Sequence, residues 1–493
     1  MNLGKLIVVE LYFALLILDT VTIALQPNIL WIMSDDLGWG EVEVFPGGSK
    51  NGRIRTPNLN QFAAEGMRFM NAYSGYSLCS PSRASFFSGV HSGFFSKYNV
   101  LYKNNNSDDY SGGFNQEILT VTEILKDAGY ETALVGKADP LKDPVLSGFD
   151  TFFGQIYKSE CHNRYPRKIT YGPAQMRYNL SLNWKEKSRT LCMENPEDYS
   201  YTIDLFQNKA LEWLDHYHVR SQMRNIAHEE HHPFFLMMSY TIPHSGGWRD
   251  DGAREGEPVP TNGIYKKRNW PDIEKDHASA ITYMDNYIGQ LISKLRQLGI
   301  DENTITIFAS DNGPHGEAAH DYTFFNSSGG LKGGKNSIYE GGIRTPTLIR
   351  WPGHVPAGKV SDFQWAFWDV FPTLADLAGV DKNKLPHYLS GRSILSTLLE
   401  RENPPPPKYL YFTGNLYFDA EDIVCAYAIR SGRWKGVSKN CFGIPQLTDE
   451  MELYDLISDP NETEDISKYF PDEVDNLKNI LASENGISCE CYS

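Results

Sequence analysis

The chain has no excess of basic residues and, beyond its N-terminal region, no long apolar run. Lysine and arginine total 46 against 62 aspartate and glutamate residues, which gives a formal charge of −16 at pH 7. Without a basic excess a protein cannot neutralise many phosphates, so this balance argues against general nucleic-acid binding. An acidic surface favours solubility, and it means that an anionic ligand would need a locally basic pocket. Without a later apolar stretch of about 20 residues, we expect no membrane span in the mature chain.

The single long apolar run lies at the N-terminus. It extends from Leu6 to Leu18, is interrupted by Glu10, and follows Lys5. Its length and position suit a secretory signal peptide better than a membrane span, and the alternative is an uncleaved anchor. Small residues at positions 22 and 24 make cleavage after Ala24 plausible. We therefore predict that residues 1–24 are a signal peptide.

The remaining chain alternates predicted strands with predicted helices. A continuous apolar run at 28–33 is typical of a strand buried on both faces. This alternation favours an α/β domain in which a mixed, mostly parallel sheet lies between helices. Further strands are predicted at 131–135, 233–239 and 304–309, and helices at 57–66, 201–217 and 275–298.

The pattern changes near the proline run at 404–407. Residues 409–413 and 424–430 read as strands of a smaller antiparallel sheet. A chain of 493 residues is also too long for one ordinary core. We predict a catalytic domain over residues 25–400 and a C-terminal α+β subdomain over residues 401–493.

Polar residues with oxygen ligands follow two of the predicted strands. Asp35 and Asp36 follow the first strand, and Asp311 and Asn312 follow the strand at 304–309. Open α/β sheets bind ligands at such strand ends. Three carboxylates and one amide suit calcium, or less readily magnesium, and offer no soft ligand to zinc or copper. A single pair such as Asp35-Asp36 is more often a turn or a helix cap, so the prediction depends on both pairs.

The most specific segment begins at Cys79 and reads Cys-Ser-Pro-Ser-Arg, with Arg83 four residues on and Gly89 ten residues on. A buried cysteine before a proline-started helix would explain a small apolar residue, but not the arginine and glycine at these spacings. The segment resembles the motif of the type I sulfatases, and the arylsulfatases most closely. The resemblance runs from Pro27 to the region of Asp459. It implies that a formylglycine-generating enzyme converts Cys79 to formylglycine, whose hydrate is the nucleophile.

The resemblance also implies an alkaline-phosphatase-like fold and roles for other residues. Cys79 and the two strand-end pairs match the metal site of the family. Arg83 resembles the arginine that steadies the formylglycine hydroxyls, and Lys137, after a predicted strand, resembles the lysine that contacts sulfate. His244 matches the histidine that protonates the departing alcohol, and Lys335 the lysine that contacts both sulfate and the leaving oxygen. Taken singly, each lysine would read as solvated and His244 as a loop residue; together they form a basic pocket.

One position departs from the family pattern. Sulfatases commonly read Gly-Lys-Trp-His after this strand, whereas this chain has Gly-Lys-Ala-Asp and places Asp139 where the histidine is expected. In the family that histidine takes a proton from the hydrate, so the group that expels sulfate is not identified by the resemblance. Asp139 itself, His162, His315 or no dedicated base are the alternatives, and Asp139 could instead pair with Lys137.

Cysteines and glycosylation sequons agree with a secretory route. If Cys79 is the modified cysteine, the other six can form three disulfides in an oxidising compartment, with 161–192 and 425–441 as local pairings. Four Asn-x-Ser/Thr sequons are N-glycosylation acceptors. The six cysteines are Cys161, Cys192, Cys425, Cys441, Cys489 and Cys491, and the sequons begin at Asn105, Asn179, Asn326 and Asn461.

The resemblance implies an arylsulfatase-like hydrolase of sulfate esters that acts outside the cell or in the lysosome. Its natural ester and its oligomeric state are left open. One alternative is a phosphodiesterase of the same superfamily, but members with serine or threonine nucleophiles lack the run around Cys79. A second is a secreted sulfatase-like matrix protein that binds sulfated glycans without turnover, to which the change at Asp139 gives some support.

Overall fold

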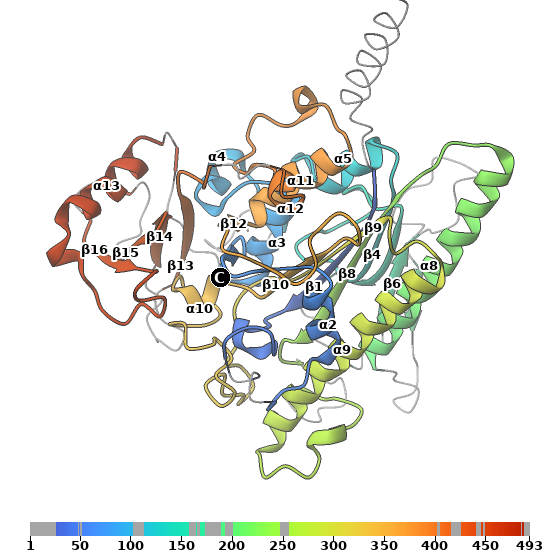
Figure 1. Ribbon diagram of the computed structural model, residues 1–493, viewed down its shortest axis with the longest axis horizontal. Helices are drawn as coiled ribbons and strands as arrows, with labels where there is room; N and C mark the ends of the chain where they lie inside the picture. Colours follow the sequence, from blue (N-terminus) through green and yellow to red (C-terminus); the bar gives the residue numbers. More distant parts are fainter. Residues whose placement is uncertain are drawn as a thin grey trace, which may run out of the picture.

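The structure is a computed structural model of the full chain. It describes residues 26–47, 49, 52–101, 113–156, 164, 168–172, 189–192, 201–246, 256–401, 405–415, 425–439, 445–446, 449–484 and 486–487. The described residues form a large α/β unit and a smaller C-terminal sheet, which lies to one side of the large unit in Figure 1.

A ten-stranded mixed sheet is the centre of the large unit. Its strands lie in the order β11-β2-β10-β9-β1-β8-β4-β5-β6-β7. The five strands from β9 to β5 in this order are mutually parallel, and β10, β6 and β7 bring in antiparallel pairings. The predicted mixed, mostly parallel sheet is therefore confirmed. The strands are β1 (Asn28–Asp35), β2 (Met67–Phe69), β4 (Glu131–Lys137), β5 (Thr151–Gln155), β6 (Lys168–Gly172), β7 (Arg189–Cys192), β8 (Phe234–Pro243), β9 (Thr304–Ser310), β10 (Thr347–Arg350) and β11 (Lys359–Ser361).

Helices cover both faces of this sheet, as the apolar strand at 28–33 predicts. Along β1, Ile29, Trp31 and Met33 belong to one buried cluster, and Leu30 and Ile32 belong to the other. The strand β1 therefore buries both of its faces, which requires a continuous apolar run. The first face is covered by α3 (Cys79–Ser88), α5 (Val121–Asp127), α11 (Val370–Leu377) and α12 (Leu395–Leu398), and the second by α2 (Pro57–Ala64), α8 (Thr202–Ala227) and α9 (Asp272–Gln297).

The helix α8 ends ten residues beyond the end that the sequence predicts. Its apolar stripe ends near Tyr217, and the second half presents Val219, Met223 and Ile226 to solvent. The prediction followed the buried stripe, but a helix continues beyond its packed face until its backbone is broken. That break comes at His228, which has a φ of 56°.

The C-terminal unit is a four-stranded antiparallel sheet with one helix, which confirms the predicted smaller sheet. It contains β13 (Leu410–Asn415), β14 (Cys425–Ser431), β15 (Trp434–Ser438), β16 (Met451–Asp455) and α13 (Pro471–Ala482). A buried lysine of β15, Lys435, joins it to the large unit. Its Nζ donates to Ile338 O and Glu340 Oε1, both at 3.0 Å, and lies 2.7 Å from Glu462 Oε1. The domain boundary near residue 400 stays a prediction.

Other sequence predictions fall partly outside the described residues. The signal peptide, Asn105, Asn179 and Cys161 lie there, while Asn326 and Asn461 are exposed on the described surface. Cys425 is disulfide-bonded, and its predicted partner Cys441 is outside the described part. Among the helices that the structure describes, none has the length and apolar character to cross a membrane.

Candidate active site

Four parallel strands end at the same edge of the sheet, and the predicted site residues lie at these ends. Asp35 and Lys137 are the last residues of β1 and β4, while His244 and Asp311 directly follow β8 and β9. Backbone hydrogen bonds fix these ends side by side. The Asp311 N–H donates to Ser34 O at 3.2 Å, and the His244 N–H donates to Asp35 O at 3.0 Å. The structure thus brings together side chains at the strand ends that are up to 276 positions apart.

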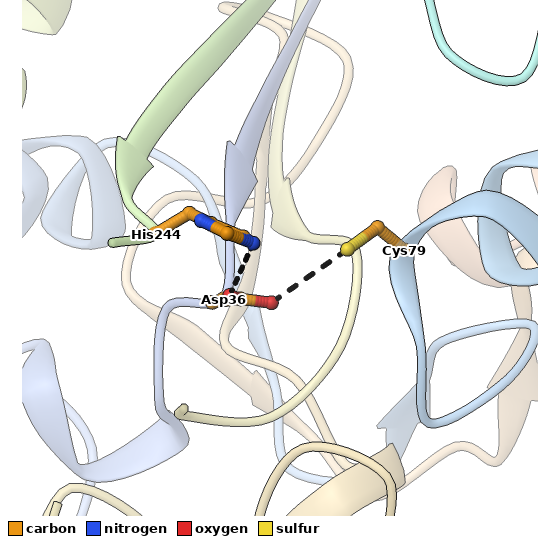
Figure 2. A group of neighbouring side chains, drawn as sticks. All are labelled: Asp36, Cys79 and His244. Carbon is orange, nitrogen blue, oxygen red and sulfur yellow. Dashed lines mark hydrogen bonds and ion pairs between the residues drawn. The ribbon is translucent and has the colours of Figure 1, made fainter. Parts of the chain in front are cut away.

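Cys79 is the first residue of α3 and faces these strand ends. Its Sγ is 3.9 Å from Asp36 Oδ1, and Figure 2 shows the Asp36 carboxylate between the Cys79 sulfur and the His244 ring. Pro81 lies in the first turn, where a missing N–H costs little. Cys79 is buried and free of disulfides. Burial raises the pKa of its thiol well above the ordinary value, unlike the activated thiolates of cysteine enzymes.

Arg83 lies one turn further along α3 and is fully buried. Its Nε donates to Asp311 Oδ2 at 2.8 Å, and its Nη1 donates to Ser239 Oγ at 2.7 Å. Its Nη2 is 3.8 Å from Asp35 Oδ1. Arg83 therefore links α3 to the middle of β8 and to the ends of β1 and β9, and fixes where residue 79 stands relative to the carboxylates.

Lys137 and Asp35 form a second buried ion pair, with 2.9 Å between Nζ and Oδ2. The residue before it, Gly136, has a φ of 113°, and a Cβ at this position would lie 1.9 Å from Ser239 O. Only glycine allows β4 to approach β8 this closely. The glycine in the Gly-Lys pair thus has a steric role in placing the lysine.

Lys335 is held by three acceptors. Its Nζ is 2.9 Å from Asp36 Oδ2, 2.6 Å from Glu317 Oε1 and 3.0 Å from His244 Nε2. The Nδ1 of His244 is 2.8 Å from Ser245 O, which makes Nε2 the ring nitrogen that faces Lys335 and the site. Burial and the nearby Lys335 ammonium hold the pKa of His244 well below its ordinary value.

The strand-end oxygens fit a hard divalent cation. Three carboxylates, Asp35, Asp36 and Asp311, are fully buried near Cys79. The Oδ1 of Asn312 is buried and has no hydrogen-bond partner among the described residues, while its Nδ2 donates to Asp36 Oδ1 at 2.7 Å. Burial and the neighbouring Asp35 raise the pKa of Asp311 to about 7. Calcium or magnesium would satisfy the amide oxygen and reduce the repulsion between the carboxylates.

The three alternatives for the missing histidine differ in their surroundings. Asp139 accepts a hydrogen bond from the hydroxyl of Ser80, the residue after Cys79, whereas Lys137 pairs with Asp35 instead. His315 is buried with both ring nitrogens engaged: Nδ1 accepts the Glu317 N–H at 3.1 Å, and Nε2 is 3.2 Å from Pro243 O. His162 lies outside the described residues.

Sequence reasoning missed Ser239 and Glu317. Ser239 lies within a predicted strand, and its place near that strand's end was a signal that could have been used. Glu317 follows Asn312 by five residues in a loop without a recognisable pattern. It accepts hydrogen bonds from Lys335 and, at 2.9 Å, from Ser245 Oγ. Burial opposes its ionisation, but Lys335 and His244 outweigh burial and hold the pKa of Glu317 below its ordinary value.

A buried group of histidines and carboxylates lies beside the site and was also missed. His277 is in contact with carboxylates on both sides: Nε2 is 2.6 Å from Glu41 Oε1, and Nδ1 is 2.9 Å from Glu257 Oε1. Glu257 also lies 3.2 Å from the Nε2 of His315. The ring of His277 stacks on His320 at 3.8 Å. This group ties the segment after Asp36 to the loops that carry His244 and Glu317.

The chain belongs to the sulfatase family. The profile described as Sulfatase matches residues 27–380, and the profile described as N-sulphoglucosamine sulphohydrolase, C-terminal, matches residues 333–484. The predicted family is thereby confirmed, and hydrolysis of sulfate esters is the activity that the family supports.

Individual relatives cover most of the chain. N-acetylgalactosamine-6-sulfatase of Homo sapiens is 31% identical over 401 residues, which are 78% of this chain and 68% of that protein. Arylsulfatase A of Homo sapiens is 29% identical over 477 residues, 89% of this chain and 83% of that protein. A crystal structure of Ps i-CgsB in complex with k-i-k-neocarrahexaose is similar, with a TM-score of 0.68, 25% identity, and coverage of 94% of this chain and 93% of that one.

We predict that the buried imidazolium of His277 makes stability depend on pH. Despite burial, Glu257 and Glu41 raise the pKa of His277 from 6.5 to about 10. Because the folded pKa is the higher one, the stabilisation is complete below pH 6.5 and is lost as pH rises towards 10. A pKa that is higher by about 3.5 in the folded state corresponds to roughly 5 kcal/mol. Urea unfolding at pH 6, 8 and 10 measures this loss.

The matched variant is His277→Gln, which cannot carry the charge. It should unfold about 3–5 kcal/mol more easily at pH 6, because two buried carboxylates lose their cation. It should also lose most of the wild-type decline between pH 6.5 and 10. An equally steep decline in both proteins would contradict the assignment of this titration to His277.

Proposed function

We propose that the protein hydrolyses sulfate esters of glycans at the site around Cys79, with Cys79 converted to formylglycine and calcium as the bound cation. The observation that carries the proposal is one buried cluster of side chains that contains Cys79 at the start of α3, an oxygen ligand set, and the cations Arg83, Lys137 and Lys335. With a divalent cation added, this charge-balanced cluster is complementary to a sulfate group, although the chain as a whole is acidic.

The formylglycine and the divalent cation supply chemistry that the encoded side chains lack. When present, the hydrated formylglycine supplies a nucleophilic oxygen, and a divalent cation held by Asp35, Asp36, Asp311 and Asn312 withdraws electron density from a sulfate oxygen.

The chain's own residues bind the ester, stabilise its charge and transfer protons. Lys137 and Lys335 both act electrostatically on Cys79 and would donate to sulfuryl oxygens, as cations do in phosphoryl transfer. Arg83 holds position 79 against the strand ends. His244 Nε2 and Lys335 Nζ, 3.0 Å apart, form the pair that would deliver a proton to the leaving oxygen. Asp139, anchored by Ser80, is the residue that we propose takes up the proton when sulfate is released.

A glycan is proposed as the natural substrate because of what the relatives are named for. They include N-acetylgalactosamine-6-sulfatase, and the C-terminal profile is that of N-sulphoglucosamine sulphohydrolase. Small aryl sulfates, the expectation from the arylsulfatase resemblance, would then serve as assay substrates.

We also propose that the chain passes through the secretory pathway, to the lysosome or the extracellular space. The disulfide of Cys425, the two exposed sequon asparagines and the predicted signal peptide support this route. A formylglycine-generating enzyme would be a partner during secretion.

We predict that Cys79→Ser abolishes turnover and traps sulfate. The serine hydroxyl can accept the sulfuryl group once, but it has no second hydroxyl whose deprotonation would expel the sulfate. Incubation with a ³⁵S-labelled aryl sulfate should leave label on the peptide that contains position 79, and Cys79→Ala should take up none. Wild-type rates in the serine variant would contradict the mechanism.

Comparing the turnover of an aryl sulfate with that of an aryl phosphodiester separates the alternative functions. A phosphodiesterase would turn over an aryl phosphodiester faster than an aryl sulfate. A matrix protein without activity would bind sulfated glycans and turn over neither ester.

We predict that Asp139→Ala slows the release of sulfate and not the departure of the alcohol. A pre-steady-state burst of alcohol, equal to the enzyme concentration, should precede a steady rate lowered by about 10²–10⁴, the usual contribution of a general base. Ser80→Ala, which removes only the hydrogen bond to Asp139, should have a much smaller effect. A steady rate within twofold of wild type for Asp139→Ala would exclude Asp139 as the base.

A further inference from the structure

The side chain of Glu317 combines contact with the catalytic residues and exposure to solvent. Its carboxylate lies 2.6 Å from Lys335 Nζ and 3.8 Å from His244 Nε2. The side chain is 39% exposed, whereas those of Lys335 and His244 are 4% exposed. Glu317 therefore lies at the rim of the site, on the side of the two residues that face the leaving oxygen.

The loop around Glu317 holds this side chain in a fixed position. The Glu317 N–H donates to the buried Nδ1 of His315, and its carbonyl accepts the His320 N–H at 3.0 Å. Between them, Ala318 and Ala319 have φ values of 54° and 65°. Two successive alanines in the left-handed region are energetically unfavourable, so the surrounding contacts must impose this conformation. Strain of this kind is found where a side chain has to be placed for function.

We propose that Glu317 determines which alcohols can leave: its carboxylate favours leaving groups that carry a cation or hydrogen-bond donors beside the ester, and disfavours those with a second anion there. The inference rests on the proposed function, because it assigns the Lys335 and His244 side to the leaving oxygen. A sugar with free hydroxyl or amide N–H groups meets an acceptor at the rim. A sugar with a carboxylate or a second sulfate next to the ester meets a like charge.

The test uses three aryl sulfates that differ in the charge of the para substituent: 4-(aminomethyl)phenyl, 4-acetylphenyl and 4-carboxyphenyl sulfate. For the wild-type holoenzyme we expect kcat/KM to favour the cationic over the anionic ester by about tenfold beyond the effect of leaving-group basicity, as one unit charge at a partly exposed rim can produce. Glu317→Gln keeps the size and hydrogen-bonding ability of the side chain but not its charge. In this variant, the ratio of kcat/KM for the cationic ester to kcat/KM for the anionic ester should fall about tenfold relative to wild type.

Two control variants separate charge at the rim from other effects. Glu317→Asp retains the charge and should retain most of the discrimination. Asp321→Asn removes the same charge from an exposed position of the same loop, where the carboxylate bonds only to Thr323 among the described residues, and should leave the ratio unchanged.

The outcomes are distinct. A lower ratio in Glu317→Gln alone supports the proposal. An equal fall in kcat/KM for all three esters would overturn it, since Glu317 would then only position Lys335. An unchanged ratio, or an equal change in Asp321→Asn, would also overturn it. If the wild-type protein turns over none of the esters, the proposed function fails and this inference falls with it.

Discussion

Charge balance in a buried volume is the constraint on which the rest of the structure depends. Three carboxylates and three cations lie together at the strand ends, paired as Asp35 with Lys137, Asp36 with Lys335, and Asp311 with Arg83, at 2.8–2.9 Å. Removing these charges from water is costly, and close pairing with good geometry is what offsets the cost. The members come from β1, β4, α3 and the segments after β9, so these elements must all be in register for the site to form. A divalent cation bound by these carboxylates would add positive charge to the cluster. It would also have the buried Oδ1 of Asn312 as a ligand.

Two groups of residues that contact this set differ in chemistry. Lys335 and His244 face each other, and the partly exposed Glu317 contacts both. Asp139 lies with Ser80 next to residue 79, where the family pattern has a histidine. A carboxylate at this point is less suited to lie near sulfate than an imidazole, because like charges repel. The hydrogen bond from Ser80 ties Asp139 to the residue next to the nucleophile and gives it a defined place despite that repulsion.

Most of the sheet and most of the site could be predicted from the sequence, and for the same reason. Buried parallel strands need continuous apolar runs, so β1, β8 and β9 stand out, and polar residues directly after such strands must meet at one edge. The resemblance to the sulfatases then supplied the roles proposed for Arg83, Lys137, His244 and Lys335. Glu317 and the group around His277 could not be found in this way. These residues lie in loops or on α9, whose apolar spacing indicates only which face of the helix is buried. Their partners are distant in sequence. The second half of α8 was not predicted because it has no buried apolar stripe.

The central claim is that Cys79 is the precursor of the nucleophile, and mass spectrometry of the peptide that spans residues 77–83 tests it most directly. In protein from its native source, we expect the mass loss that accompanies conversion of cysteine to formylglycine, together with trapping of the aldehyde by a hydrazide reagent. An unmodified cysteine at position 79 in protein that hydrolyses sulfate esters would contradict it.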